Sequence, residues 1–113
     1  MRKDEIVKEI CEELVKDDII AGFKYDHFEE SEAILPPFAV YRRVAPENFS
    51  ADGVVYHRGD NVDLEIYASD PDEMIDIMAA AEAAMNDAGL YFAIAADTAY
   101  IESEDFYETL YEL

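Results

Sequence analysis

A strand pattern that leads directly into a helix pattern, between Asn61 and Gly89, constrains the fold of this chain more than any other stretch. In its first part, Val62, Leu64 and Ile66 alternate with charged or aromatic residues. A period of two places these three side chains on one face of a strand and the residues between them on the other. The stretch therefore predicts a half-buried strand that is followed at once by a helix.

Both ends of that helix are marked in the sequence. Asp70 can cap the free backbone N–H groups, and Pro71 suits the first helical position. Five apolar residues then recur at helical spacing: Met74, Ile77, Met78, Ala81 and Met85. Gly89 supplies a left-handed stop. A strand with one apolar face beside a helix with one apolar stripe is a packing unit, and we expect the other segments to be added to it.

The residues before this unit predict a second helix and a second strand. An amphipathic helix is expected from about residue 3 to residue 16. Cys11 lies on its apolar stripe, where a small buried hydrophobe is a better interpretation than a nucleophile or a metal ligand. Residues 19–21 predict a short strand or an apolar tether, and 22–37 follow no regular pattern. Pro36 and Pro37 then bar a helix just before residue 38 and suit the entry of a strand, which is expected over 38–44.

After the central helix, a strand is expected over 90–95, loosened at 96–99 and resumed at 100–102. A turn at 104–105 precedes a final strand over 106–113. This strand has Phe106 and Leu110 on one face, and Tyr107, Tyr111 and Leu113 on the other. We expect the helices to cover one face and a neighbouring subunit to cover the other.

These elements predict a single domain over residues 1–113 with an α+β fold. Their order is helix, strand, long loop, strand, helix, strand, strand. We expect a mainly antiparallel sheet of about four or five strands, with both helices packed on one face.

The charge of the chain limits its partners. It has 28 acidic and 8 basic residues, for a formal net charge of −20. Such a field repels nucleic acids and anionic membranes, which argues against ordinary binding to a phosphate backbone. No apolar run resembles a signal peptide or approaches the length of a membrane span. We therefore expect a soluble protein that is made in the cytoplasm and does not bind membranes.

The motifs that usually carry catalysis are absent from the sequence. It has no phosphate-binding glycine loop, CxxC pair, HExxH or GxSxG. His27 has no cysteine or second histidine at ligand spacing. Asp52, His57 and Asp60 could form an acid–base group, but no nucleophile or glycine-rich context completes it. We therefore expect no catalytic residues, no metal and no cofactor.

The same residues fit an assembly component better. Arg42 and Arg43 are a quarter of the basic residues, and we expect them to pair with carboxylates on a neighbouring strand or a neighbouring subunit. Residues 45–60 form a loop too long for a tight hairpin, apart from a short strand expected at 54–56. The chain also has eight tyrosines, a residue enriched at interfaces.

Four stretches, taken in order, resemble the small tail terminator (tail completion) proteins of long-tailed bacteriophages and prophages. They are residues 37–41 (PFAVY), residues 48–52 (NFSAD) with Tyr56, residues 62–67 (VDLEIY) with Asp72, and residues 100–104 (YIESE) before the tyrosine-rich last strand. The resemblance lies in their order and spacing, because none of these motifs is specific alone. The alanine-rich helix and the higher acidity depart from the usual pattern of the family.

The resemblance implies a homo-oligomeric ring, expected to be hexameric, in the neck of a virion assembled in a bacterial host. Such a ring caps the tail tube, stops its polymerisation and presents a docking surface for the head-tail connector, while DNA passes through without specific binding. The residues expected at subunit or partner interfaces are Arg42, Arg43, Asn48, Phe49, Asp52, Tyr56, His57, Arg58, Tyr107 and Tyr111.

Two other functions remain open at this stage. One is a head-tail joining or stopper protein of the same neck, which would bind the portal complex rather than the tail tube. The other is an acidic DNA mimic that inhibits a nucleic-acid-binding enzyme. A mimic needs its charges clustered at phosphate-like spacing, whereas acidic residues here alternate with apolar residues. An enzyme is the third choice.

Overall fold

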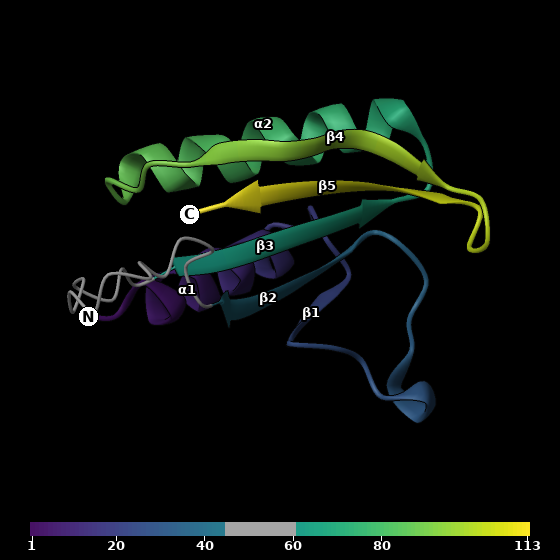
Figure 1. Cartoon of the computed structure of the whole chain (residues 1–113), viewed down its shortest axis with the longest axis horizontal. Coiled ribbons are helices and arrows are strands. Elements are labelled where there is room, and N and C mark those ends of the chain that lie inside the picture. The colour runs from purple at the N-terminus through teal and green to yellow at the C-terminus, as the bar shows by residue number, and fades with distance from the viewer. Residues whose placement is uncertain (45–60) are drawn as a thin grey trace, which may run out of the picture.

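The computed structural model describes residues 1–44 and 61–113 of the chain (Figure 1). The strand expected at 54–56 lies outside these residues. The elements are α1 (Lys3–Lys16), β1 (Gly22–Tyr25), a 3-10 turn η1 (Glu30–Glu32), β2 (Phe38–Val44), β3 (Asn61–Ala68), α2 (Pro71–Asp87), β4 (Ala93–Ile101) and β5 (Phe106–Glu112).

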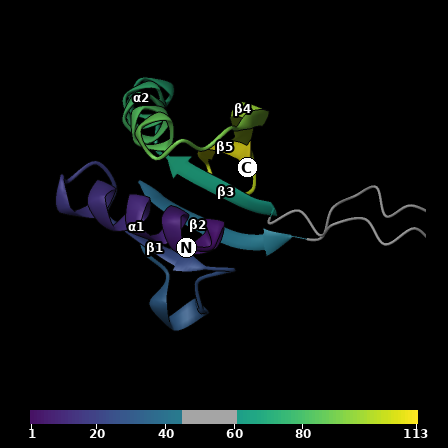
Figure 2. The same cartoon turned by 90° about the vertical axis from the view of Figure 1, so that its left-hand side faces the viewer.

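The strands form one five-stranded sheet in the order β1-β2-β3-β5-β4. β1 runs parallel to β2, and every other neighbouring pair is antiparallel. Both helices pack against the same face of the sheet, α1 over β1, β2 and β3 and α2 over β3 and β5 (Figures 1 and 2). The expected α+β fold, with a mostly antiparallel sheet and two helices, is confirmed.

The start of α2 follows from its sequence. The Asp70 carboxylate accepts a hydrogen bond from the Glu73 N–H at 2.8 Å, and the Glu73 carboxylate accepts one from the Ser69 N–H at 2.9 Å. Two backbone donors that the helix itself cannot satisfy are thereby paired. Gly89 has a φ of 73°, so it provides the left-handed turn that was expected there.

The core lies between the helices and the sheet. Four residues of β3 point into it: Val62, Leu64, Ile66 and Ala68. They meet the stripe of α2, of which all five expected residues are buried. Cys11 on α1 is also fully buried, as expected for a small hydrophobe. The alternation in β3 and the helical stripe in α2 therefore serve one common core.

Two expectations for the strands need correction. Residues 22–25, which show no regular pattern in sequence, form β1 at the edge of the sheet. The strand expected from residue 90 begins instead at Ala93, because Leu90 and Phe92 pack against the core in the connection after α2. The loosening expected at 96–99 corresponds to two register shifts, between Ile94 and Ala96 and between Ala96 and Ala99.

The segment at 19–21 is a tether and not a strand, and it is anchored by the buried side chain of Ile20. Neither described helix has the length and the hydropathy needed to cross a membrane.

Candidate functional site

The face of the sheet opposite α1 and α2, here called the open face, carries a mixture of apolar and acidic side chains. Cross-strand register places three rows on it: Phe38, Tyr67 and Glu108; Val40, Glu65 and Leu110; Arg42, Asp63 and Glu112. Residues directly opposite each other in antiparallel strands share a face, so each row crosses β2, β3 and β5 side by side. One end of the open face is therefore aromatic, and the other end is charged.

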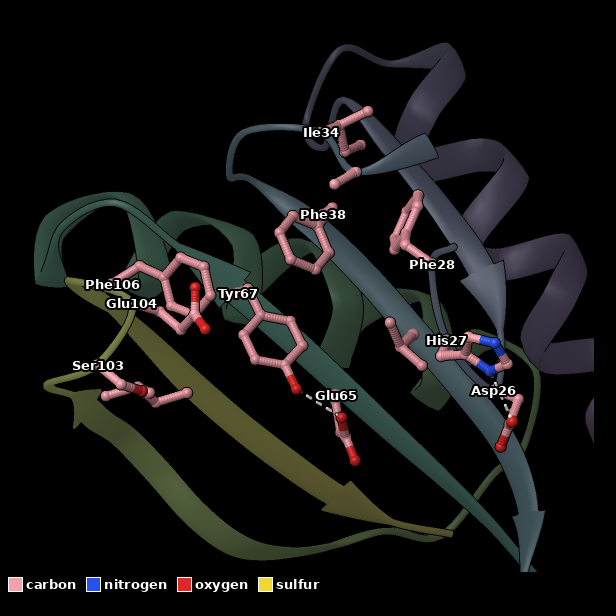
Figure 3. A pocket seen from close by; sticks show the side chains of 13 residues that line it. Asp26, His27, Phe28, Ile34, Phe38, Glu65, Tyr67, Ser103, Glu104 and Phe106 are labelled. Carbon is pink, nitrogen blue, oxygen red and sulfur yellow. Dashed lines mark hydrogen bonds and ion pairs between the residues drawn. The ribbon is translucent and has the colours of Figure 1, made fainter. Parts of the chain in front are cut away.

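The aromatic end forms a groove. Phe38 stacks on Tyr67 with ring centroids 4.8 Å apart, and Phe106 lies 5.3 Å from Tyr67. Phe28 meets the edge of Phe38 at 5.1 Å. These four rings come from four separate segments (Figure 3). We call this cavity, of about 410 Å³, the aromatic groove.

Two chain segments wall the aromatic groove. Residues 26–34, between β1 and β2, form one wall, and the end of β4 with the turn to β5 forms the other. The cavity is also lined by Asp26, His27, Ala33, Ile34, Val40, Glu65, Ile101, Ser103 and Glu104. A second hollow continues past Ile34 along Leu35 and Pro36. Leu35 is 84% exposed, a large apolar side chain left in solvent beside the groove.

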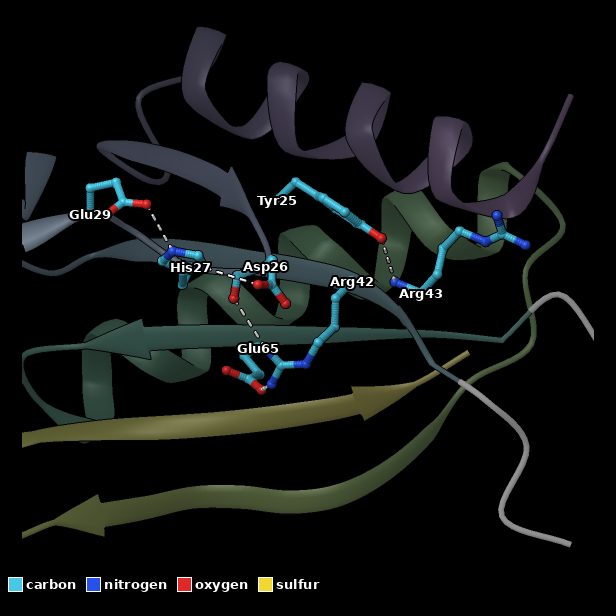
Figure 4. A network of polar contacts seen from close by, with 7 residues as sticks. All are labelled: Tyr25, Asp26, His27, Glu29, Arg42, Arg43 and Glu65. Carbon is cyan, nitrogen blue, oxygen red and sulfur yellow. Dashed lines mark hydrogen bonds and ion pairs between the residues drawn. The ribbon is translucent and has the colours of Figure 1, made fainter.

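Arg42 and Tyr67 both bind Glu65 at the charged end of the groove. The Arg42 guanidinium pairs with one carboxylate oxygen of Glu65 and also donates to the backbone carbonyl of Asp26 at 3.1 Å (Figure 4). The Tyr67 hydroxyl donates to the other Glu65 oxygen at 2.6 Å. Burial and this hydrogen bond raise the pKa of Tyr67, so it remains a protonated donor. Arg42 thus has a carboxylate partner on the neighbouring strand, one of the two kinds expected.

His27 lies between two carboxylates on the wall of the groove. Its Nδ1 is 2.9 Å from Asp26 Oδ2, and its Nε2 is 3.0 Å from Glu29 Oε1 (Figure 4). The hydrogen bonds with Asp26 and Glu29 raise the pKa of His27 above its usual value. Within residues 1–44 and 61–113, no group of three or more His, Cys, Asp or Glu side chains is placed to hold a metal ion.

Cys11 has no access to solvent and cannot act as a ready nucleophile. Burial, with a smaller contribution from Glu12, raises the pKa of its thiol to about 12. The reactive form of a cysteine is the thiolate, which this environment disfavours at neutral pH.

The other residues expected at interfaces are scattered. Arg43 is exposed, and its backbone N–H donates a hydrogen bond to the Tyr25 hydroxyl at 3.3 Å. Tyr107 is half-buried against the core, on the helix face of β5. Tyr111 is fully buried there and donates to Glu82 at 2.7 Å, so its side chain is not available to a partner and the interface expectation fails for it. Six more candidates lie outside the described residues: Asn48, Phe49, Asp52, Tyr56, His57 and Arg58.

The aromatic groove itself was not foreseen as a site. The alternation in β3 placed Tyr67 on the polar face, and Phe106 was assigned to a face opposite Tyr107. What the sequence does not state is that β5 lies beside β3 and that Phe28 folds back over Phe38. The sequence feature that points to this groove is the set of aromatic residues at polar-face positions of different strands.

Comparisons of the chain with protein-family models, with curated proteins and with solved structures found no match.

Proposed function

We propose that this protein is a structural component of a phage or prophage neck, a tail terminator whose copies form a ring on the end of the tail tube. The ring stops polymerisation of the tube and offers a docking surface to the head-tail connector.

The open face of the sheet carries this proposal. Neither described helix covers it, although it holds three aromatic rings from adjacent strands, those of Phe38, Tyr67 and Phe106. Exposed Leu35 extends its apolar area. A face of this kind is typical of a protein that buries it against another subunit.

The order of the described elements also supports the proposal. Two adjacent antiparallel strands, then a helix, then two further strands follow the order on which the resemblance to tail terminators rests. A closed ring requires two different patches that fit each other on successive copies. The open face is a candidate for one of them.

The charge is compatible with this role. A formal net charge of −20 would give a ring an acidic bore, through which DNA phosphates slide without being held. The same charge opposes association of the copies, so the ring should strengthen as salt screens the repulsion.

The deciding experiment adds the purified protein to a polymerising tail-tube protein of the same phage. Electron microscopy should show tubes of limited length with a ring on one end, and light scattering at low and high salt should show a ring of about six copies that salt favours. Tubes that grow equally long with and without the protein, at every salt concentration, would refute the proposal. Binding to the portal complex and not to the tube would identify the protein as a stopper.

A matched pair of variants tests the part played by the open face. Leu35→Ser removes an exposed leucine beside the aromatic groove, and Ile75→Ser removes an isoleucine that is 60% exposed on α2. Neither side chain is in the core, so both variants should fold. We expect Leu35→Ser to weaken ring formation and Ile75→Ser to leave it unchanged. The reverse result would place the interface on the helix side.

A further inference from the structure

The aromatic groove has the composition of a site for a cation. Four half-buried rings border it, from Phe28, Phe38, Tyr67 and Phe106. The face of an aromatic ring attracts a positive charge, and this attraction grows when the cation is partly removed from water. The volume of the groove, about 410 Å³, is enough for a large side chain. It lies near the lower limit of the volumes typical of ligand pockets, which is roughly 300 Å³.

The charges around the groove point the same way. Among the residues that the structure describes, its lining includes three carboxylates, those of Asp26, Glu65 and Glu104, and no lysine or arginine. Of these described lining groups, His27 alone can become positive, and it is held by Asp26 and Glu29. A positively charged occupant is therefore favoured over a neutral or anionic one.

The carboxylates at the two ends of the groove differ in how they are occupied. Glu65 already binds the guanidinium of Arg42 and the hydroxyl of Tyr67. Glu104, in the turn between β4 and β5, is exposed, and its carboxylate has no partner within residues 1–44 and 61–113. Glu104 lies beside Phe106 in Figure 3, so an unpaired carboxylate and an aromatic ring occur together at this end.

We propose that the aromatic groove binds an arginine side chain presented by a partner polypeptide. The guanidinium stacks on the rings of Tyr67 and Phe106 and donates hydrogen bonds to the Glu104 carboxylate. Arginine fits better than lysine, because its planar guanidinium both stacks on rings and binds a carboxylate through two parallel hydrogen bonds.

The surroundings of the groove favour a polypeptide over a free small molecule. The second hollow, along Ile34, Leu35 and Pro36, shares Glu104 and Phe106 with the aromatic groove. An apolar residue next to the arginine would cover Leu35, which is otherwise 84% exposed. This inference goes beyond the proposed function and does not depend on it, since it concerns the chemistry of the bound side chain and not the identity of the assembly.

The test uses an acetylated, amidated peptide of sequence Gly-Leu-Arg-Leu-Gly, titrated into the isotope-labelled full chain and followed by NMR. A second peptide carries citrulline, a neutral side chain of nearly the same shape, in place of arginine. Salt is kept at about 0.15 M, where the Debye length is about 8 Å and long-range attraction to the acidic surface is weak. We expect saturable shifts at Phe28, Tyr67, Glu104 and Phe106 with the arginine peptide, and much weaker binding of the citrulline peptide.

A pair of variants separates the site from the general acidity. Glu104→Gln removes the unpaired carboxylate, whereas Glu102→Gln removes an exposed carboxylate from the same turn that does not line the groove. We expect Glu104→Gln to raise the Kd of the arginine peptide about fivefold, as for one exposed ion pair. Glu102→Gln should leave the Kd unchanged. Neither change touches the core, so both variants should fold.

Several outcomes would overturn the inference. Equal weakening by both variants, or shifts spread over the acidic surface, would show attraction by net charge alone. Equal binding of the citrulline peptide would show an apolar site without a preference for a cation. Shifts at the groove that appear on raising the protein concentration without peptide, and that the arginine peptide does not displace, would show that a second copy of this chain occupies the groove through another side chain. Absence of any saturable shift would leave the groove without this ligand.

Discussion

The position of His27 between two carboxylates makes a direct prediction about its titration. Its pKa should lie above the usual 6.5 in the folded chain, because Asp26 and Glu29 both bind its ring. A histidine whose folded pKa is raised contributes stability that is complete below pH 6.5 and is lost as pH rises through the folded pKa. NMR titration of the ring protons measures this pKa, with the signal assigned by His27→Gln.

The control for this prediction removes the carboxylates one at a time. Asp26→Asn and Glu29→Gln should each lower the pKa of His27, because each removes a hydrogen bond that favours the protonated ring. A pKa that stays the same in both variants would mean that neither hydrogen bond persists in solution.

Thr98 has an unusual backbone conformation for a β-branched residue. Its φ is 52°, in the left-handed region that favours glycine and asparagine. The Thr98 N–H donates to the Thr109 hydroxyl at 3.0 Å, which helps to hold this conformation in the irregular part of β4. We expect Thr98→Asn to raise the free energy of unfolding by up to about 1 kcal/mol, because asparagine tolerates this region better.

Urea denaturation measures this change, and the neighbouring residue supplies the control. Ala99 does not have a positive φ, so Ala99→Asn should bring no gain. Equal losses of stability in the two variants would argue that the conformation at Thr98 carries no strain.

The start of α2 shows how a single residue can fix the end of a helix in this chain. Asp70 caps the first turn through its hydrogen bond to the Glu73 N–H. We expect Asp70→Ala to lower the free energy of unfolding by about 1 kcal/mol, the usual effect of losing such a cap. Asp76→Ala removes an exposed aspartate from the middle of the same helix, where alanine is a better helix former, and should not destabilise the protein. Equal effects on the urea midpoint would contradict the capping argument.

The elements that could be predicted from sequence are those with a local pattern. The helix at 3–16, the strands at 38–44 and 61–68 and the helix from 71 follow from periodicity and capping. β1 could not be predicted in this way, because it has only four residues and is held by its pairing with residues of β2 that lie sixteen positions further on. The start of β4 was predicted too early, because the apolar residues Leu90 and Phe92 pack against the core before the strand begins.

The candidate site was harder to predict than the fold. Each ring of the aromatic groove belongs to a segment whose own pattern explains it, and only the strand order brings them together. Arg42 was singled out correctly as an ion-pair residue, since a cation in so acidic a chain has many possible partners. Tyr111 was misread as an interface residue, because a tyrosine at the end of a strand gives no local sign that a helix covers it.

The whole molecule carries a charge that should limit its own stability. With a formal net charge of −20, like charges repel one another across the folded surface more strongly than in an expanded chain. We expect the free energy of unfolding to rise as salt increases from about 0.01 M to about 0.1 M, where the Debye length shortens from about 30 to about 10 Å. Urea denaturation at fixed pH measures this. A decrease with salt would instead mean that ion pairs such as Arg42–Glu65 outweigh the general repulsion.

The strand order has a consequence for how the chain is made. β3 is flanked in the sheet by β2 and β5, and the residues of β5 are translated only after α2 and β4. As the polypeptide leaves the ribosome, β3 therefore has one neighbour, while its second edge waits for a partner more than thirty residues downstream. During that interval the nascent chain exposes the open edge of β3, an unpaired row of backbone N–H and C=O groups. A ribosome-bound chaperone that shields this half-built sheet would raise the yield of folded protein more than one that acts after release.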